Sequence, residues 1–272
     1  MTVTPDAALR SRHILGMRVD ATSYADAADR VLTWAKAGES RSVCVAAVST
    51  VMAARDDRGF RSWVDSADLV TPDGMPLVWG LRWLGVPKAT RVYGPELMPV
   101  ILSRAASEDV PVAFVGGTPH VLDRLSKRAG IDFPGLRVVH RSSPFDDGTP
   151  SELDGKIADE IRESGARIVF VGLGCPKQER WMARQRANVQ AVMLGVGAAF
   201  DFLAGVKPQA PPLVRRIGLE WLFRLATEPR RLSGRYLRQN PRFAMLFARQ
   251  LFAERVGRRS DRLTQVDTAD EG

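Results

Sequence analysis

Apolar residues occur along the chain in short runs of strand length, separated by stretches with a helical pattern such as residues 150–164. Both faces of such a run are apolar, which is typical of buried parallel strands covered by helices. A strand over residues 14–19 and a helix over 24–37, capped by Thr22 or Ser23, are predicted to precede these runs. The sequence therefore predicts an α/β fold, a Rossmann-like, mostly parallel sheet flanked by helices. The predicted buried strands are residues 43–48, 113–115, 136–139, 168–171 and 191–196.

The pattern changes after residue 206, where apolar residues recur at helical spacing between arginines. Over residues 213–225 they recur every four residues, which predicts one amphipathic helix. Over residues 241–256 phenylalanine and leucine alternate with arginine in the same manner. We therefore predict three parts: an α/β catalytic body over residues 1–206, a basic helical appendage over 207–256, and a disordered tail over 257–272.

The net charge of +8 is concentrated in the predicted appendage. Residues 207–259 contain thirteen Lys and Arg against three Asp and Glu, whereas residues 1–206 are almost balanced, with 25 against 24. An acidic partner is therefore expected at the C-terminal end. An anionic membrane surface suits apolar faces bordered by arginine and aromatics, although packing on the body or on another subunit fits the same pattern. Nucleic acid is disfavoured because no recognised nucleic-acid-binding motif accompanies the basic residues.

The composition is that of an ordinary globular protein, with 272 residues, 45% apolar and 26% charged. Only two cysteines are present, Cys44 and Cys175, so a disulfide scaffold and a zinc cluster are not expected. The first twenty residues lack a secretory pattern, and the most apolar stretch, residues 191–206, is too short to cross a bilayer and is interrupted by Asp201. A cytoplasmic location is therefore expected.

Three of the predicted strands end in glycine clusters, at residues 115–119, 171–176 and 194–198. The carboxyl ends of parallel strands meet at one edge of a sheet, where ligands bind. Glycines such as Gly116 and Gly117 let backbone amides approach an anion there, which favours a phosphorylated ligand; tight turns alone would also explain them. None of the clusters matches a dinucleotide or P-loop fingerprint, which disfavours a nicotinamide dehydrogenase or a P-loop enzyme.

Few side chains are placed to carry out chemistry. Asp73 lies in a Pro-Asp-Gly turn after a short apolar run, where it is either a turn former or a general base. Arg91 precedes another turn, Gln178 begins a helical pattern after the second glycine cluster, and Asp201 is a lone acid in an apolar stretch that requires hydrogen-bond partners. The three histidines have no ligand spacing, so a metal site is not expected.

Seven motifs occur in an order that resembles the WecG/TagA/CpsF family, glycosyltransferase family 26, from about residue 14 to residue 252. The resemblance implies an inverting, metal-independent enzyme without a cofactor, which moves an N-acetylhexosamine of the ManNAc or ManNAcA type from a UDP-sugar to a polyprenyl-diphosphate-linked sugar. It implies a role in cell-surface or exopolysaccharide biosynthesis, at the inner face of the plasma membrane, by a protein that can self-associate. The motifs are Thr-Pro-Asp-Gly-Met-Pro at 71–76, Arg-Val-Tyr-Gly at 91–94, Phe-Val-Gly-Gly-Thr-Pro at 114–119, Phe-Pro-Gly-Leu at 133–136, the stretches 171–179 and 195–207, and Gly-Leu-Glu-Trp-Leu-Phe-Arg at 218–224.

The resemblance also implies roles for individual residues. Asp73 matches the family's proposed catalytic base, and one carboxylate suffices for an inverting transfer because it takes the proton of the acceptor hydroxyl. Asp201 matches an acid thought to contact the uracil. The remaining matches are polar pocket residues, Arg91 and Gln178, and appendage arginines proposed to reach the diphosphate, Arg224, Arg231 and Arg235.

The chain departs from the family pattern after the second predicted strand. Where many members carry Thr and Asn, this chain has Val45 and Ala47, with Ser49 two positions further on. Those polar side chains are expected near the reacting sugar, so the departure bears on the identity of the donor or acceptor and on the level of activity. An alternative function follows from it, a nucleotide-sugar-binding or scaffolding protein of a polysaccharide assembly complex.

Overall fold

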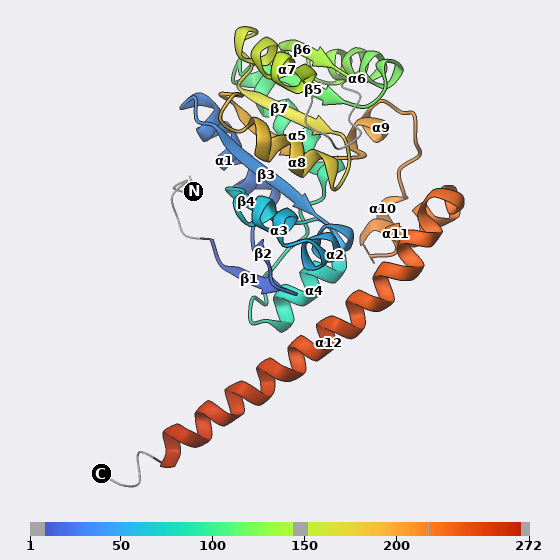
Figure 1. Ribbon diagram of the computed structural model, residues 1–272. Coiled ribbons are helices and arrows are strands. Elements are labelled where there is room, and N and C mark those ends of the chain that lie inside the picture. The colour runs from blue at the N-terminus through green and yellow to red at the C-terminus, as the bar shows by residue number, and fades with distance from the viewer. Residues whose placement is uncertain (1–8, 144–151, 217, 268–272) are drawn as a thin grey trace.

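The computed structural model describes residues 9–143, 152–216 and 218–267 (Figure 1). Its centre is a six-stranded parallel sheet with the strand order β4-β3-β8-β7-β5-β6. The predicted α/β class is confirmed. The strands are β3 (Arg41–Ala46), β4 (Leu69–Pro72), β5 (Val112–Gly116), β6 (Val138–Ser142), β7 (Ile168–Gly172) and β8 (Val192–Gly195).

Helices cover both faces of the sheet, because alternate residues of each strand point to opposite sides. In β3, Val43 and Val45 belong to one core, whereas Cys44 and Ala46 belong to another. The first core packs α1 (Tyr24–Lys36), α5 (Gly94–Ser107), α6 (Pro119–Asp132) and α9 (Ala199–Leu203). The opposite face is covered by α2 (Val48–Asp56), α3 (Arg58–Asp65), α7 (Glu152–Glu163) and α8 (Lys177–Gln185).

The single strand predicted over residues 14–19 is wrong. Two antiparallel strands, β1 (Ser11–Ile14) and β2 (Met17–Asp20), form a hairpin there. The turn uses left-handed backbone at Leu15 (φ 51°) and Gly16 (φ 91°), which glycine adopts without a steric penalty. Periodicity alone missed the turn because Leu15 is itself apolar and 6% exposed.

The single helix predicted over residues 213–225 is also wrong. The chain forms α10 (Pro212–Arg216) and α11 (Glu220–Thr227) instead, separated at Gly218, whose φ is +79°. A Cβ at this glycine would lie 3.0 Å from the Met75 side chain. The break therefore lets the appendage turn closely over α4 (Met75–Trp83).

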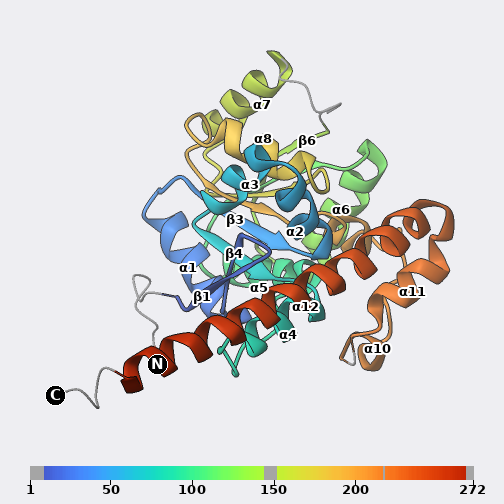
Figure 2. The same cartoon turned by 60° about the horizontal axis from the view of Figure 1, so that its bottom comes forward.

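A long helix, α12 (Pro229–Asp267), follows and passes through Pro241 without interruption. It extends to Asp267, into the segment for which we predicted a disordered tail; residues 268–272 lie outside the described residues. Figures 1 and 2 show that α12 runs diagonally along α2 and α4 and projects beyond the body. Within the described parts of the chain, no helix has the length and apolar character needed to cross a membrane.

The middle of α12 is part of the body's core. Phe243 and Phe247 stack at 5.7 Å and are buried with residues of α4. Gly80 of α4 permits this approach, since a Cβ there would lie 3.2 Å from the Phe247 ring. The Gln250 side chain accepts a hydrogen bond from the Leu15 backbone N–H at 2.8 Å, and Arg242 pairs with Asp56 at 2.6 Å. The appendage is therefore docked along the body, not only tethered to it.

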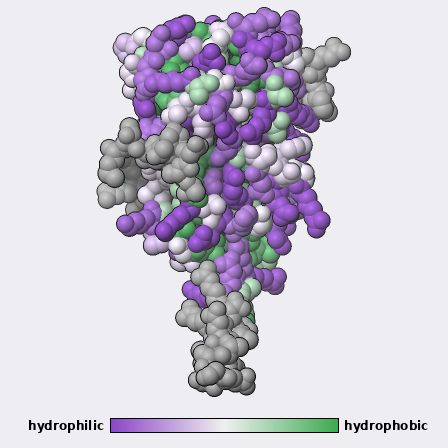
Figure 3. Space-filling view, turned by 90° about the vertical axis from the view of Figure 1, so that its left-hand side faces the viewer, coloured by the Kyte–Doolittle hydropathy of each residue, from purple (hydrophilic) through white to green (hydrophobic). Residues whose placement is uncertain are grey.

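Exposed apolar side chains concentrate near this docking line. The face of the body turned to the viewer in Figure 3 is mostly hydrophilic. By contrast, nine large apolar residues of α4, α11 with its N-cap, and α12 are at least 40% exposed. This distribution needs an explanation, because exposed apolar patches of this kind mark interaction surfaces. The nine residues are Trp79, Trp83, Leu219, Trp221, Leu222, Leu237, Met245, Phe252 and Val256.

Candidate active site

Asp73 lies at the carboxyl end of β4, between the sheet and α4. Its backbone N–H continues the ladder by donating to the Ala46 carbonyl of β3 at 2.9 Å. Gly74 is the N-cap of α4, and Pro76 lies in the first turn, where its missing N–H costs nothing. The Pro-Asp-Gly sequence thus ends a strand and starts a helix, which fixes the carboxylate at the sheet edge.

Arg91 holds the Asp73 segment from the neighbouring loop. Its Nε donates to the Asp73 backbone carbonyl at 2.5 Å. Its Nη2 lies 3.7 Å from Asp73 Oδ1, which is an ion pair but too long for a hydrogen bond. The guanidinium stacks over the Tyr93 ring at 4.1 Å. Arg91 therefore positions the turn through its backbone and makes no hydrogen bond to Asp73 Oδ1.

The Asp73 carboxyl is poised for proton transfer. Oδ1 is buried and has no hydrogen-bond partner. Burial raises the pKa of this carboxyl to about 7, against the opposing effect of Arg91. An unpartnered buried oxygen costs about 1–3 kcal/mol, and a pKa near 7 suits a general base. Together these features are typical of a functional carboxylate, not of a turn former.

Helix α11 closes over this carboxylate. Glu220 is buried and accepts a hydrogen bond from Arg91 Nη2 at 2.7 Å. One turn later, Arg224 lies over the Phe202 ring at 5.7 Å, and its Nε is buried without a hydrogen-bond partner. The appendage thus adds an acid and an arginine to the site formed by the body.

A cavity of about 920 Å³ begins at Asp73. Its wall includes Arg91, Tyr93, Glu220 and Arg224, and it continues between α4 and α12. The volume is at the upper end of the range for small-molecule sites. The structure therefore brings together three of the residues singled out in the sequence, namely Asp73, Arg91 and Arg224.

The three glycine turns lie at the same sheet edge as Asp73, because they follow the parallel strands β5, β7 and β8. Gly116 and Gly117 both have left-handed backbone, with φ of 113° and 72°. A Cβ at Gly116 would lie 2.7 Å from the Gly172 backbone, and a Cβ at Gly172 would lie 2.6 Å from the Phe200 ring. Close packing therefore requires these glycines, and they are not part of the wall of the large cavity.

Gln178 is enclosed by protein instead of lining the cavity. It is 3% exposed. Its Oε1 accepts from the Gly174 N–H at 3.1 Å, and its Nε2 donates to Glu179 Oε1 at 3.0 Å. A Cβ at Gly195 would lie 2.9 Å from that Nε2. The amide is thus hydrogen-bonded to the turn after β7 and packs closely against Gly195 at the end of β8.

The other predicted site residues lie elsewhere. Asp201 is in α9 and pairs with Lys207 at 2.7 Å, so its carboxylate has a cation partner within the chain. Arg231 and Arg235 belong to α12, but their side chains lie outside the described residues. At the end of β3, Ala47 and Ser49 line the cavity, whereas Val45 is 7% exposed and packs in the core. Position 47 is therefore the point where the departure from the family pattern reaches the cavity.

Two of the buried acids that were not singled out in the sequence lie near the site, Glu220 and Glu179. Glu220 is the only charged residue between Gly218 and Arg224, a signal that could have been recognised, as it was for Asp201. Glu179 is 3% exposed, and burial raises its pKa to about 7. Its neighbours in the sequence are polar, so no local pattern indicates that it is buried. In the residues that the structure describes, no group of three or more His, Cys, Asp and Glu side chains is arranged to hold a metal ion.

Comparisons with known proteins agree with the motif resemblance. The family model described as Glycosyl transferase WecG/TagA/CpsF family matches residues 12–257. A curated relative from Bacillus spizizenii, named N-acetylglucosaminyldiphosphoundecaprenol N-acetyl-beta-D-mannosaminyltransferase, is 34% identical over 173 residues. That alignment covers 63% of this chain and 65% of the relative, slightly less than two thirds of the relative's length.

Proposed function

The chain belongs to the WecG/TagA/CpsF family of glycosyltransferases, and from this premise we propose that it transfers an N-acetylhexosamine of the ManNAc type from a UDP-sugar to a polyprenyl-diphosphate-linked sugar. The relative's name specifies an N-acetylmannosaminyl transfer to N-acetylglucosaminyldiphosphoundecaprenol. The observation that carries the proposal is the buried, unpartnered Asp73 oxygen in a cavity whose wall also contains Arg91 and Arg224. We propose a role in cell-surface or exopolysaccharide biosynthesis.

In the proposed mechanism the Asp73 carboxylate, whose side chain is 22% exposed, accepts the proton of the acceptor hydroxyl. The hydroxyl oxygen forms a bond to the anomeric carbon of the donor as the bond from that carbon to the UDP oxygen breaks. The electron pair of the broken bond leaves with UDP, and attack from the opposite face inverts the anomeric centre. A single base suffices for such a step and contributes about 10²–10⁴-fold.

We propose that Arg224 stabilises the charge that develops on the leaving diphosphate. Arg224 is half-buried on the cavity wall, its Nε has no hydrogen-bond partner, and an arginine fork matches phosphate oxygens in a bidentate manner. This role lets the reaction proceed without a metal ion or a cofactor. By the motif resemblance, Asp201 and the glycine turns at residues 116–117 are proposed to hold the nucleotide, with Gln178 fixing the adjacent turns.

The experiment is a transfer assay with purified full-length protein. A panel of UDP-N-acetylhexosamines is incubated with N-acetylglucosaminyl-diphospho-undecaprenol in detergent, with and without EDTA, and products are identified by mass spectrometry. We expect one donor to give UDP and an extended lipid-linked disaccharide at equal rates in both conditions. Tight UDP binding without turnover of any donor would contradict the proposal and favour the alternative of a binding or scaffolding protein.

The pH dependence of transfer is expected to follow Asp73. Its pKa is raised to about 7, and only the deprotonated carboxylate can accept a proton. Consequently kcat should fall about tenfold for each pH unit below 7 and reach a plateau above about pH 8. Steady-state rates at saturating substrates between pH 5 and 9 measure this, and a flat profile across that range would contradict the assignment of Asp73 as base.

We further propose that the outer face of α12 lies on the membrane that carries the acceptor. Arg238, Met245, Arg249, Phe252 and Val256 recur at intervals of seven, four, three and four residues, so they share one face of the helix. Met245, Phe252 and Val256 are each more than half exposed. Mixed arginine and apolar residues on an exposed face are typical of helices at an anionic interface.

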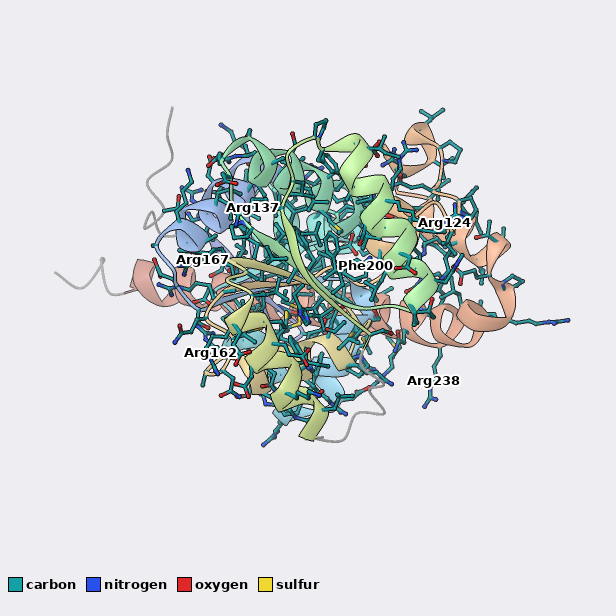
Figure 4. The ribbon with its side chains drawn as sticks, turned by 90° about the horizontal axis from the view of Figure 1, so that it is seen from above. Arg124, Arg137, Arg162, Arg167, Phe200 and Arg238 are labelled. Atoms are coloured by element: carbon teal, nitrogen blue, oxygen red, sulfur yellow. The ribbon has the colours of Figure 1, made fainter. Side chains whose placement is uncertain are left out.

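Charge reversal on this face is expected to weaken membrane binding. Each basic residue near an anionic surface contributes about 1 kcal/mol, so Arg238→Glu with Arg249→Glu should weaken binding to phosphatidylglycerol vesicles about 30-fold or more. Sedimentation with vesicles measures it. A matched control is Arg137→Glu with Arg162→Glu, since these exposed arginines lie far from Arg238 (Figure 4). Equal binding by the two double variants would contradict an α12-specific contact.

Deletion of residues 207–272 is a poorer test of membrane binding, because it also removes Phe243 and Phe247 from the core.

A further inference from the structure

The cavity that begins at Asp73 has charged residues at one end and an apolar wall along most of its length. Asp73, Arg91, Glu220 and Arg224 lie together at the inner end. Among the lining residues that the structure describes, the remaining charged one is Arg255, on the part of α12 that lines the other end of the cavity. A sugar or a nucleotide needs polar partners along its whole surface, so the apolar part of this cavity does not suit either substrate head group.

The apolar part is a groove between α4 and α12. On α4, Met75, Trp79 and Trp83 recur every four residues and form one wall. Phe243 and Phe247 of α12 form the floor, where Phe247 stacks on Trp83 at 6.2 Å. The opposite wall is a stripe of α12 that spans about 27 Å at 1.5 Å per residue. This stripe consists of Leu237, Ala244, Ala248, Leu251 and Arg255.

The groove stripe of α12 adjoins the outward face that we propose to be on the membrane. The groove stripe (residues 237, 244, 248, 251 and 255) has the same intervals of seven, four, three and four residues as the outward face (residues 238, 245, 249, 252 and 256). Each of its positions comes one residue earlier in the sequence. One position is about 100° of rotation, so the two stripes are neighbours on the helix surface. Phe252 belongs to both, because it lines the groove and is 72% exposed. The groove therefore opens along the side of α12 that faces the proposed membrane.

From this geometry we infer that the groove between α4 and α12 binds the isoprenoid chain of the lipid-linked acceptor, nearest to its diphosphate. The inference rests on the proposed function, because it takes the acceptor to be a polyprenyl diphosphate. A chain that leaves the membrane beside Phe252 passes along Trp83 and Trp79 and brings its polar end to the arginines and Asp73. A bound isoprenoid chain also covers Trp79, Trp83 and Leu237, whose side chains are otherwise 40%, 60% and 69% exposed to water.

If the groove binds the isoprenoid chain, the enzyme should distinguish acceptors that differ only in their lipid chain. Two acceptors are compared in detergent, N-acetylglucosaminyl diphosphate linked to undecaprenol and the same head group linked to a short linear alkyl chain. Ala248→Trp fills the groove. We expect it to raise KM for the undecaprenyl acceptor about tenfold, a loss equivalent to about two buried methylene groups, and to change kcat/KM for the short acceptor less than twofold.

Ala253→Trp is the matched control, because Ala253 is exposed on another side of α12 and does not line the groove. It should leave both acceptors unaffected. Equal effects of the two substitutions on the undecaprenyl acceptor would overturn the inference. If a second copy of the chain occupies the groove instead, Ala248→Trp would change the mass measured by light scattering and leave the acceptor preference unchanged, which also overturns it.

A second measurement uses the unmodified protein. Farnesyl diphosphate with a diazirine on its isoprenoid chain is photolysed with the full chain, and adducts are located by mass spectrometry. Adducts within residues 75–83 and 237–255 that decrease in Ala248→Trp support the inference, and adducts elsewhere overturn it. Failure of every donor and acceptor to react would overturn the proposed function alone, because this probe tests the groove without turnover.

Discussion

Asp73→Asn is expected to lower kcat by about 10²–10⁴-fold, the usual contribution of a general base. The substitution keeps the size and shape of the side chain and removes its ability to accept the proton of the acceptor hydroxyl. The backbone carbonyl at position 73 still accepts from Arg91 Nε, and Arg91 Nη2 still donates to Glu220. The local structure should therefore remain, and the loss should appear in the chemical step. Single-turnover rates with saturating donor and acceptor measure it.

The same substitution should stabilise the fold at high pH. Because the pKa of Asp73 is raised to about 7, the folded protein retains a proton that the unfolded chain releases near pH 4. Stability is therefore lost as pH rises from about 4 to 7, and Asn removes this loss. We expect Tm of Asp73→Asn to exceed that of the wild type by about 5 °C at pH 8 and to equal it near pH 4. A variant that is both inactive and less stable at pH 8 would indicate a structural carboxylate instead of a base.

The sequence predicted the parts of the fold that depend on local patterns. Runs such as residues 168–171 are apolar on both faces because they become inner strands of a covered sheet, so the pattern and the parallel arrangement have one cause. Because the strands are parallel, their carboxyl ends share one edge of the sheet. The glycine turns and Asp73, which come directly after strands, are therefore expected at that same edge. The association of Asp73, Arg91 and Arg224 needed the motif resemblance as well, because Arg224 reaches the site from the appendage.

The features of the fold and of the site that the sequence did not predict depend on contacts between distant segments of the chain. Gly218, where the chain breaks between α10 and α11, packs closely against Met75, more than 140 residues earlier. The continuous α12 packs on α4 and its Gln250 hydrogen-bonds to His13 of β1 and to Leu15 in the following turn. The periodicity of residues 213–225 cannot report such contacts, which is why it predicted one helix. Gln178 illustrates the same limit, since its polar character indicates a pocket residue, whereas its amide is enclosed by Gly174 and Glu179.

Arg224→Met is the second substitution for which we expect a large effect. Methionine keeps an unbranched side chain against the Phe202 ring but has no charge or N–H donors. If Arg224 stabilises the leaving diphosphate, kcat should fall about 10²–10³-fold, as for the loss of one preorganised donor. Arg224→Lys should retain part of the activity, because a lysine supplies the charge without the planar fork. Measuring kcat for both variants with the same donor and acceptor tests whether Arg224→Lys is more active than Arg224→Met.

Arg238→Met is the control, and the split between kcat and KM separates two roles for Arg224: stabilising the leaving diphosphate, or holding α11 over the site. Arg238→Met removes a guanidinium from the exposed face of α12, and it should leave kcat unchanged. An interaction made only in the transition state lowers kcat with little change in KM, whereas an arginine that merely holds α11 in place would raise KM and lower Tm. Arg224→Met with an unchanged kcat and a raised KM would therefore assign the residue to closure, and the charge on the leaving diphosphate would need another partner.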